Sequence, residues 1–254
     1  MAMLLKVPQW HSSLLTDYER LAIFKLAIEK YAKGIVYDLG TGSGILAMIA
    51  AKKAEKVYAL ELDSFTYEYA KENIERNGFK NILLYEADAE FFDYKEKADL
   101  IIAELLDTAL ITEPQVRVLN TINKKKVLKE DGKIIPEKAI STVQLVNSSL
   151  SYIHYDEEDK EKELSNEIIY EEVNFYKVNP LKVSYKFKLS GEYGENLGLK
   201  LRTYTILSEE FVSGPLRMLN PPLVIPLNVD GSDVKVKLSY KRGGDLDSIK
   251  VKVF

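Results

Sequence analysis

Apolar residues recur at helical spacing near the amino terminus of the chain. Leu21, Phe24 and Ile28 lie three or four positions apart, and Gly34 follows as a plausible stop signal. The pattern predicts an amphipathic helix over residues 17–32.

Short apolar runs then alternate with segments of helical pattern. We expect a short buried strand at residues 35–38, further strands at residues 57–60, 82–85 and 98–103, and helices at residues 45–53 and 64–77. Strands that alternate with helices imply parallel crossover connections. This part of the chain therefore predicts an α/β unit built on a parallel sheet.

The periodicity changes after Pro136. Apolar and polar positions alternate at residues 183–189, 199–203, 234–240 and 249–253. Such alternation is typical of antiparallel strands with one buried face. The densely charged segment 156–172 is expected to form either a helix or a solvated arm. We therefore expect two domains, residues 1–138 around the parallel sheet and residues 139–254 as a smaller antiparallel β unit.

Composition narrows the class of protein. The 254 residues are 46% apolar and include no cysteine, which excludes disulfides and thiolate-bound metals. His11 and His154 show no metal-ligand spacing, so no metal is expected. The absence of a leader pattern and of a long apolar stretch predicts a cytoplasmic protein without a membrane partner. A net charge of −4 weakens a nucleic-acid-binding interpretation, although a local basic patch stays compatible with it.

A glycine-rich turn follows the first expected strand. Gly40, Gly42 and Gly44 lack Cβ atoms where the chain must turn sharply and approach a ligand. The helix that follows offers unpaired N–H groups. The dinucleotide fingerprint requires glycine at its sixth position, where this chain has Ile45. The carboxylate of Asp38, just before the turn, suits an amine and a sulfonium, so the turn favours S-adenosylmethionine as the cofactor.

Further carboxylates follow the next two expected strands. Glu61 can accept hydrogen bonds from both ribose hydroxyls, and Asp88 with Ala89 can read an adenine edge, for which Glu90 is the rival. Open α/β sheets bind ligands at this edge. The expected cofactor-binding residues of the turn and the strand ends are Asp38, Gly40, Thr41, Gly42, Gly44, Ile45, Leu46, Glu61, Leu62, Asp88 and Ala89.

Three stretches of the chain match the motifs of one enzyme family. Residues 38–53 match its glycine-rich motif, residues 11–20 its His-x-x-Met-Leu-x-Asp-x-x-Arg motif with Leu14 in place of Met, and residues 104–113 its double-glutamate hairpin. The chain thus resembles class I methyltransferases, and among them the protein arginine methyltransferases; the form of its hairpin is similar to that of the monomethylating branch, which leaves mono- or dimethylation open. The resemblance implies a Rossmann-like domain followed by a barrel-like β domain. It also implies that Arg20 grips the cofactor carboxylate.

Two carboxylates suit a guanidinium acceptor. Arginine cannot be deprotonated beforehand, and a carboxylate pair can hold its planar fork while one nitrogen faces the sulfonium methyl. The rate would come from positioning and charge complementarity. We expect Glu104 and Glu113 to be catalytic with Asp107 assisting, and Glu104 also to contact the cofactor. The alternative is that Glu113 is a helix-start carboxylate and Asp107 with Thr108 a cap.

The chain also departs from that family. The Tyr-Phe-x-x-Tyr helix and the Thr-His-Trp loop are missing, and residues 220–223, the nearest counterpart of the loop, are interpreted as a turn between strands. No dimerisation arm is recognisable, which leaves homodimerisation open. We expect an N-methyltransferase with a macromolecular acceptor, either a protein arginine or RNA. The alternatives are another small nucleophile as acceptor, and a non-catalytic cofactor-binding module that recruits a partner.

Overall fold

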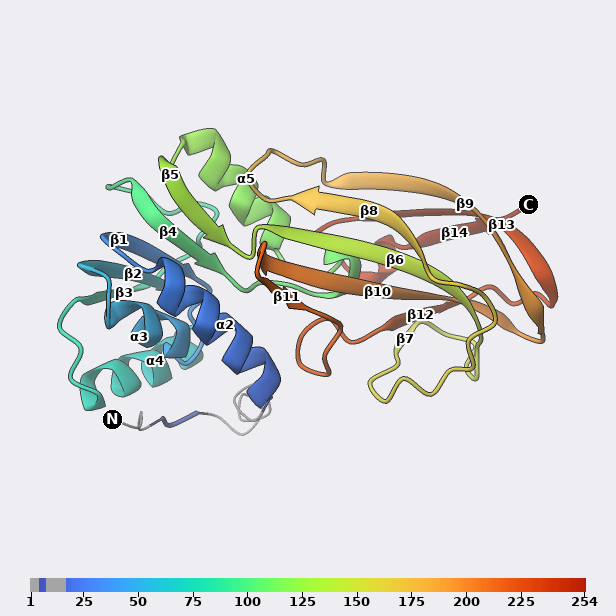
Figure 1. Ribbon diagram of the computed structural model, residues 1–254, viewed down its shortest axis with the longest axis horizontal. Helices are drawn as coiled ribbons and strands as arrows, with labels where there is room; N and C mark the ends of the chain where they lie inside the picture. Colours follow the sequence, from blue (N-terminus) through green and yellow to red (C-terminus); the bar gives the residue numbers. More distant parts are fainter. Residues whose placement is uncertain (1–4, 8–16) are drawn as a thin grey trace.

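A five-stranded parallel sheet organises the first half of the chain (Figure 1). The structure is a computed structural model that describes residues 5–7 and 17–254. The strand order across the sheet is β3-β2-β1-β4-β5. The strands are β1 (Ile35–Leu39), β2 (Lys56–Glu61), β3 (Ile82–Glu86), β4 (Ala98–Ala103) and β5 (Leu128–Ile135).

Helices connect these strands and cover the sheet. They are α2 (Tyr18–Tyr31), α3 (Ile45–Ala51), α4 (Ser64–Arg76), the 3₁₀ helix η1 (Thr108–Leu110) and α5 (Gln115–Lys125). Side-chain caps set two of the starts, because Asp17 accepts from the N–H of Arg20 at 3.0 Å and Asp63 from that of Thr66 at 2.7 Å. The helices expected at residues 17–32, 45–53 and 64–77 are confirmed as α2, α3 and α4.

The order of the strands reverses between β1 and β4. β1 lies between β2 and β4, with Leu39 opposite both Leu60 and Ala103. In open α/β sheets a ligand crevice forms at such a switch point, beyond the carboxyl ends of the strands. The turn after β1, the end of β2 at Glu61 and the segment after β4 that starts with Glu104 therefore meet at one edge.

Antiparallel strands form the second half of the chain and extend to one side of the α/β unit, with the carboxyl terminus at the far end (Figure 1). One sheet has the order β7-β12-β10-β6-β8, with β11 paired to β10, and a second has the order β14-β13-β9. The strands are β6 (Lys138–Asn147), β7 (His154–Tyr155), β8 (Ile168–Asn174), β9 (Lys182–Gly194), β10 (Leu197–Ser208), β11 (Phe211–Ser213), β12 (Leu223–Pro226), β13 (Gly231–Lys241) and β14 (Lys250–Val253), and η2 (Leu246–Ser248) precedes β14. The expected α/β sheet followed by an antiparallel β unit is confirmed.

Two apolar cores support this arrangement. The first packs beneath the parallel sheet and includes Val173 and Phe175 from the β unit. The second lies between the antiparallel sheets and receives Ala109 and Ile111 from the segment after β4. This segment is therefore embedded in the β unit, although it starts from the α/β unit.

The charged segment 156–172 forms no helix, and most of its residues are exposed, as expected for the solvated alternative. It runs as an irregular chain until β8 begins at Ile168, and some of its carboxylates pair with two cations of β10. Lys200, which is fully buried, donates to Asp156 at 2.8 Å, and Arg202 donates to Glu163 at 2.6 Å. These ion pairs anchor the segment to β10, which the sequence pattern did not predict.

Candidate active site

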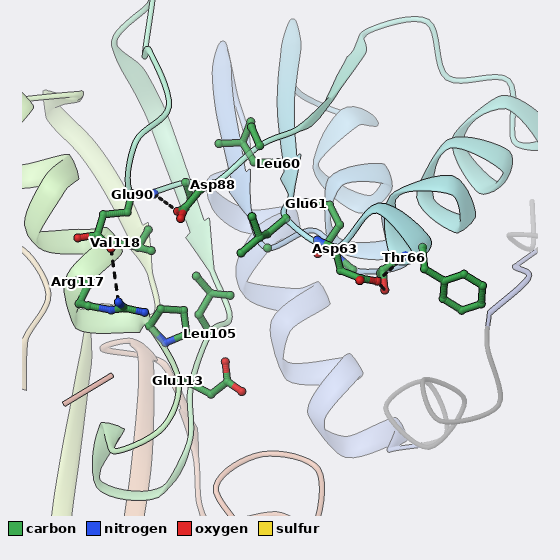
Figure 2. A pocket seen from close by; sticks show the side chains of 17 residues that line it. Leu60, Glu61, Asp63, Thr66, Asp88, Glu90, Leu105, Glu113, Arg117 and Val118 are labelled. Atoms are coloured by element: carbon green, nitrogen blue, oxygen red, sulfur yellow. Dashed lines mark hydrogen bonds and ion pairs between the residues drawn. The ribbon is translucent and has the colours of Figure 1, made fainter. Parts of the chain in front are cut away.

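A cavity of about 920 Å³ opens at the carboxyl edge of the parallel sheet (Figure 2). Segments that follow β1, β2, β3 and β4 all contribute to its wall. The predicted site residues that line it are Gly40, Gly42, Glu61, Leu62, Asp88, Ala89 and Glu113. The structure thus brings together residues from four separate parts of the sequence.

The glycine turn approaches the cavity with bare backbone. Gly40 has a φ of 74°, and a Cβ built on it would lie 2.4 Å from a side-chain carbon of Leu105. Gly44 has a φ of 82° and precedes the first residue of α3. Other residues could not adopt this turn without strain. The glycines therefore bring the backbone, without side chains, close to the space where a ligand would lie.

Glu61 joins the turn to the end of β2. One carboxylate oxygen accepts from the N–H of Gly42 at 2.9 Å, and the other accepts from the N–H of Asp63 at 3.0 Å. Because Glu61 also lines the cavity, the same carboxylate shapes the turn and faces the space where a ribose would bind. Its position agrees with the expected role but also gives it a structural one.

Asp38 lies behind the turn. Its carboxylate is buried and accepts from the hydroxyl of Thr41 at 2.6 Å. Burial raises the pKa of Asp38 to about 7. The predicted site residues that support the turn from behind, buried or half-buried, are Asp38, Thr41, Gly44, Ile45 and Leu46.

The rival carboxylates after β3 both line the cavity. Asp88 accepts from the N–H of Glu90 at 2.7 Å, and Glu90 faces Arg117 of α5 with 3.8 Å between charged atoms (Figure 2). The arrangement gives both side chains access to a bound base. Glu90 and Arg117 therefore join the set of candidate residues.

A buried ion pair links α2 to the hairpin after β4. The guanidinium of Arg20 donates to the carboxylate of Glu104, and their side chains are only 7% and 17% exposed. Burial raises the pKa of Glu104, and the positive charge of Arg20 opposes that rise. Glu113, at the other end of the hairpin, has a pKa that burial and then the charge of Glu104 raise. The two glutamates are thus within electrostatic reach of each other.

Asp107 ties the hairpin together. Its oxygens accept from the N–H and hydroxyl of Thr112 at 2.8 and 3.0 Å and from the N–H of Glu113 at 3.3 Å. Burial raises its pKa to about 6. These bonds occupy Asp107 inside the hairpin, where it braces Thr112 and Glu113; it precedes η1, but its side chain makes no capping bond to that helix.

Sequence reasoning missed much of the cavity wall. The lining residues that it did not name are Leu60, Asp63, Phe65, Thr66, Ala87, Leu105, Pro114, Arg117 and Val118. Most lie just after a strand end or in the first turn of α4 or α5, and that position alone was a usable signal. Of the motif at residues 11–20, residues 11–16, which include His11, lie outside the described part of the chain.

The part of the chain that the structure describes shows neither a metal-binding cluster nor a membrane-spanning helix. There, no group of three or more histidine, cysteine, aspartate or glutamate side chains has a metal-binding arrangement. Within the same residues, none of the helices has the length and apolarity to cross a membrane.

Comparisons with known proteins agree with this geometry. The family model for ribosomal protein L11 methyltransferases (PrmA) matches residues 19–173. An uncharacterized protein of Methanocaldococcus jannaschii is 66% identical over 256 residues, 99% of each chain. An arginine N(omega)-methyltransferase of Streptomyces achromogenes is 32% identical over 153 residues, which cover 56% of this chain and 41% of that protein.

A solved structure shares the whole fold. The PRMT1 enzyme–prozyme heterotetrameric complex of Trypanosoma brucei with AdoHcy superposes with a TM-score of 0.77 at 18% identity, covering 97% of this chain and 96% of that chain. This likeness concerns the fold. The expected cofactor, S-adenosylmethionine, follows from the match to a methyltransferase family over residues 19–173, and the glycine turn and strand-end carboxylates fit it. The chain belongs to the PrmA family and is a class I S-adenosylmethionine-dependent methyltransferase.

Proposed function

We propose that this methyltransferase transfers the methyl group to a guanidinium nitrogen of a protein arginine, held between Glu104 and Glu113. One observation carries the proposal: Glu104 already accepts a guanidinium, that of Arg20, while Glu113 lines the cavity within electrostatic reach of it. A carboxylate pair of this kind matches the fork of donors that an arginine presents.

Different residues would bind the methyl donor and the methyl acceptor. Gly40, Gly42 and Glu61 would hold the cofactor, and Arg20 would contact its carboxylate. The bound cofactor would supply a methyl group on a sulfonium, and its transfer to the acceptor nitrogen would leave the electron pair of the carbon–sulfur bond on sulfur. The nitrogen then loses a proton, which Glu113 can accept readily because its pKa is raised. Rate enhancement would come mainly from in-line positioning.

Charge around the cavity supports a cationic acceptor. Among the described residues, its wall carries the carboxylates of Glu61, Asp63, Asp88, Glu90 and Glu113. A single guanidinium, that of Arg117, faces them from the same wall. A polyanion such as RNA would be repelled from such a surface, whereas a basic peptide would be attracted.

The family match favours a second candidate, another nitrogen of a ribosomal protein, because the matching model describes ribosomal protein L11 methyltransferases. The arginine N(omega)-methyltransferase among the relatives supports the first candidate. The two predict different products, methylarginine in one case and a methylated amine in the other.

We also propose the division into residues 1–138, which bind the cofactor, and residues 139–254, which bind substrate or a second subunit. The change from a parallel sheet ending at Ile135 to antiparallel strands beginning at Lys138 supports this boundary.

Substitution of the glutamates tests the proposal. Glu113→Gln is expected to reduce methyl transfer by about 100-fold or more while cofactor binding stays within about twofold. Glu86→Gln is the matched control, because Glu86 is exposed at the end of β3 and pairs with Glu61 across the sheet. Full activity of both Glu113→Gln and Glu104→Gln would overturn the guanidinium clamp.

A further inference from the structure

The tip of the glutamate hairpin has an unusual backbone. Ala109 and Leu110 both have a φ of 59°, in the left-handed region that residues with a Cβ rarely adopt. Both are fully buried. Two consecutive residues of this kind persist only where the surroundings hold them, and such strain tends to accumulate at functional sites.

One contact that holds the tip comes from β10. The N–H of Ala109 donates to the hydroxyl of Thr203 at 2.7 Å, and that hydroxyl lies 3.2 Å from the hydroxyl of Ser141. Next to it, the hydroxyl of Thr108 donates to the carbonyl of Pro221 at 2.6 Å. The turn at residues 220–222, which the sequence left without a role, therefore lies against the hairpin.

A second set of contacts comes from the turn after β13. The N–H groups of Gly243 and Gly244 donate to the carbonyls of Leu110 and Ile111 at 3.1 and 2.7 Å. Arg242 fixes this turn, because its guanidinium pairs with Glu171 and also donates to the carbonyl of Pro180 at 2.7 Å. The side chains of Arg242 and Glu171 are each only 4% exposed.

We infer that Thr203 and Arg242 are positioning residues of the methyl-transfer site: they hold the strained tip of the hairpin and thereby fix Glu113 at the cavity. This inference rests on the proposed role of Glu113. It gives the β unit a task in the chemistry beyond binding a substrate or a second subunit. A loosened tip misplaces the glutamate, whereas the glycine turn and the strand-end carboxylates Glu61 and Asp88 lie on other segments and keep their positions.

Substitutions at Thr203 test the inference more specifically than a substitution at Arg242. Thr203→Val keeps the shape of the side chain but leaves the N–H of Ala109 without an acceptor, and Thr203→Ser restores one. Thr142→Val is the matched control, because Thr142 is also a buried threonine of the same sheet, and its hydroxyl donates to Glu167 instead of the hairpin. Arg242→Lys keeps the charge of Arg242 but loses the planar fork that reaches both Glu171 and Pro180, so it serves as an independent second variant.

The experiment compares hydrogen exchange of the peptide spanning residues 105–114 with the kinetics of methyl transfer. The acceptor is whichever macromolecule the wild-type protein labels in a host lysate with tritiated S-adenosylmethionine. We expect Thr203→Val to lose exchange protection in this peptide and to lower kcat by about 100-fold, with an unchanged KM for the cofactor. Thr203→Ser and Thr142→Val should stay within about threefold of wild type.

Two results would overturn the inference: unchanged protection in both Thr203→Val and Arg242→Lys, or lost protection with unchanged kcat. If Thr203→Val does not fold, Arg242→Lys carries the same comparison. Failure of the proposed function appears separately, as label on an acceptor that is not arginine, and the comparison of variants on that acceptor still decides the role of Thr203.

Discussion

Arg20 and Glu104 are 84 positions apart in the sequence and form a buried ion pair at the carboxyl edge of the parallel sheet. The pair places the residue expected to grip the cofactor carboxylate in contact with one end of the glutamate hairpin. If the two residues have the proposed roles, this contact joins the donor and acceptor sites, and binding of the cofactor carboxylate to Arg20 would compete with Glu104 for the same guanidinium.

Removal of one member of this pair should be costly. We expect Arg20→Met to lower the free energy of unfolding by about 3 kcal/mol, because it leaves a buried carboxylate uncompensated. Without Arg20 the folded-state pKa of Glu104 rises further, so the folded protein binds more protons than the unfolded chain, and the deficit should grow as pH rises from about 5 to 8. Urea denaturation at both pH values measures this.

The control for that experiment is an exposed ion pair. Lys30 and Glu210 are 39% and 62% exposed, so Lys30→Met should leave the free energy of unfolding close to that of the wild type. Adding Glu104→Gln to Arg20→Met should recover part of the loss. Equal effects of Arg20→Met and Lys30→Met on the free energy of unfolding would show that the buried pair stabilises the fold no more than the exposed pair.

The buried carboxylate of Asp38 predicts a pH dependence in the cofactor-free protein. Its folded pKa of about 7 lies above the ordinary value of 3.8, so the folded state binds the extra proton and stability falls as pH rises between these values. Asp38→Asn removes this penalty, which is on the order of 4 kcal/mol at pH 8. We expect the variant to melt higher than wild type at pH 8 and similarly at pH 4, as measured by calorimetry.

The same substitution should have the opposite effect on cofactor binding. The ionised Asp38 attracts the positive charges of S-adenosylmethionine, so wild-type affinity should increase as pH rises through about 7, whereas Asp38→Asn should bind more weakly with a flat pH profile. Titration calorimetry at pH 6 and 8 measures both proteins. A wild-type affinity independent of pH would contradict this role.

Glu61 should matter more for the cofactor than for the chemical step. Glu61→Gln loses the charge that organises the N–H groups of Gly42 and Asp63 and that would accept from ribose hydroxyls. We expect cofactor affinity to fall by about tenfold to a hundredfold, with kcat at saturating cofactor changing less. Glu86→Gln, on the neighbouring strand, should bind the cofactor like wild type; a matching loss there would mean that overall charge, not the position of Glu61, sets affinity.

Local patterns predicted the α/β unit well, because its strands are continuous apolar runs and its helices start at caps such as Asp17 and Asp63. The same patterns could not show that Arg20 meets Glu104, since that contact depends on packing of α2 against the sheet. Nor could they show that the 156–172 segment folds onto Lys200 and Arg202 of β10. Charge density alone does not reveal whether the partners are water or buried cations.

The backbone of the glutamate hairpin also could not be predicted from the sequence. The spacing of Glu104 and Glu113 was visible in the sequence, but the left-handed tip at Ala109 and Leu110 and its contacts with Thr203 depend on the β unit folding around it. Glu90 was named from the sequence as the rival of Asp88, and Arg117 could have been found, because it lies one helical turn beyond Glu113.

The identity of the methylated atom shows whether the acceptor is a protein arginine. A lysate of the source organism, incubated with the protein and S-adenosylmethionine tritiated at the methyl group, would be digested to amino acids and nucleosides, and the labelled product identified by chromatography. We expect label in methylarginine when the wild-type protein or Glu86→Gln is used, and no such label when Glu113→Gln is used. Label in methyllysine, in RNA, or undiminished with Glu113→Gln would contradict this expectation.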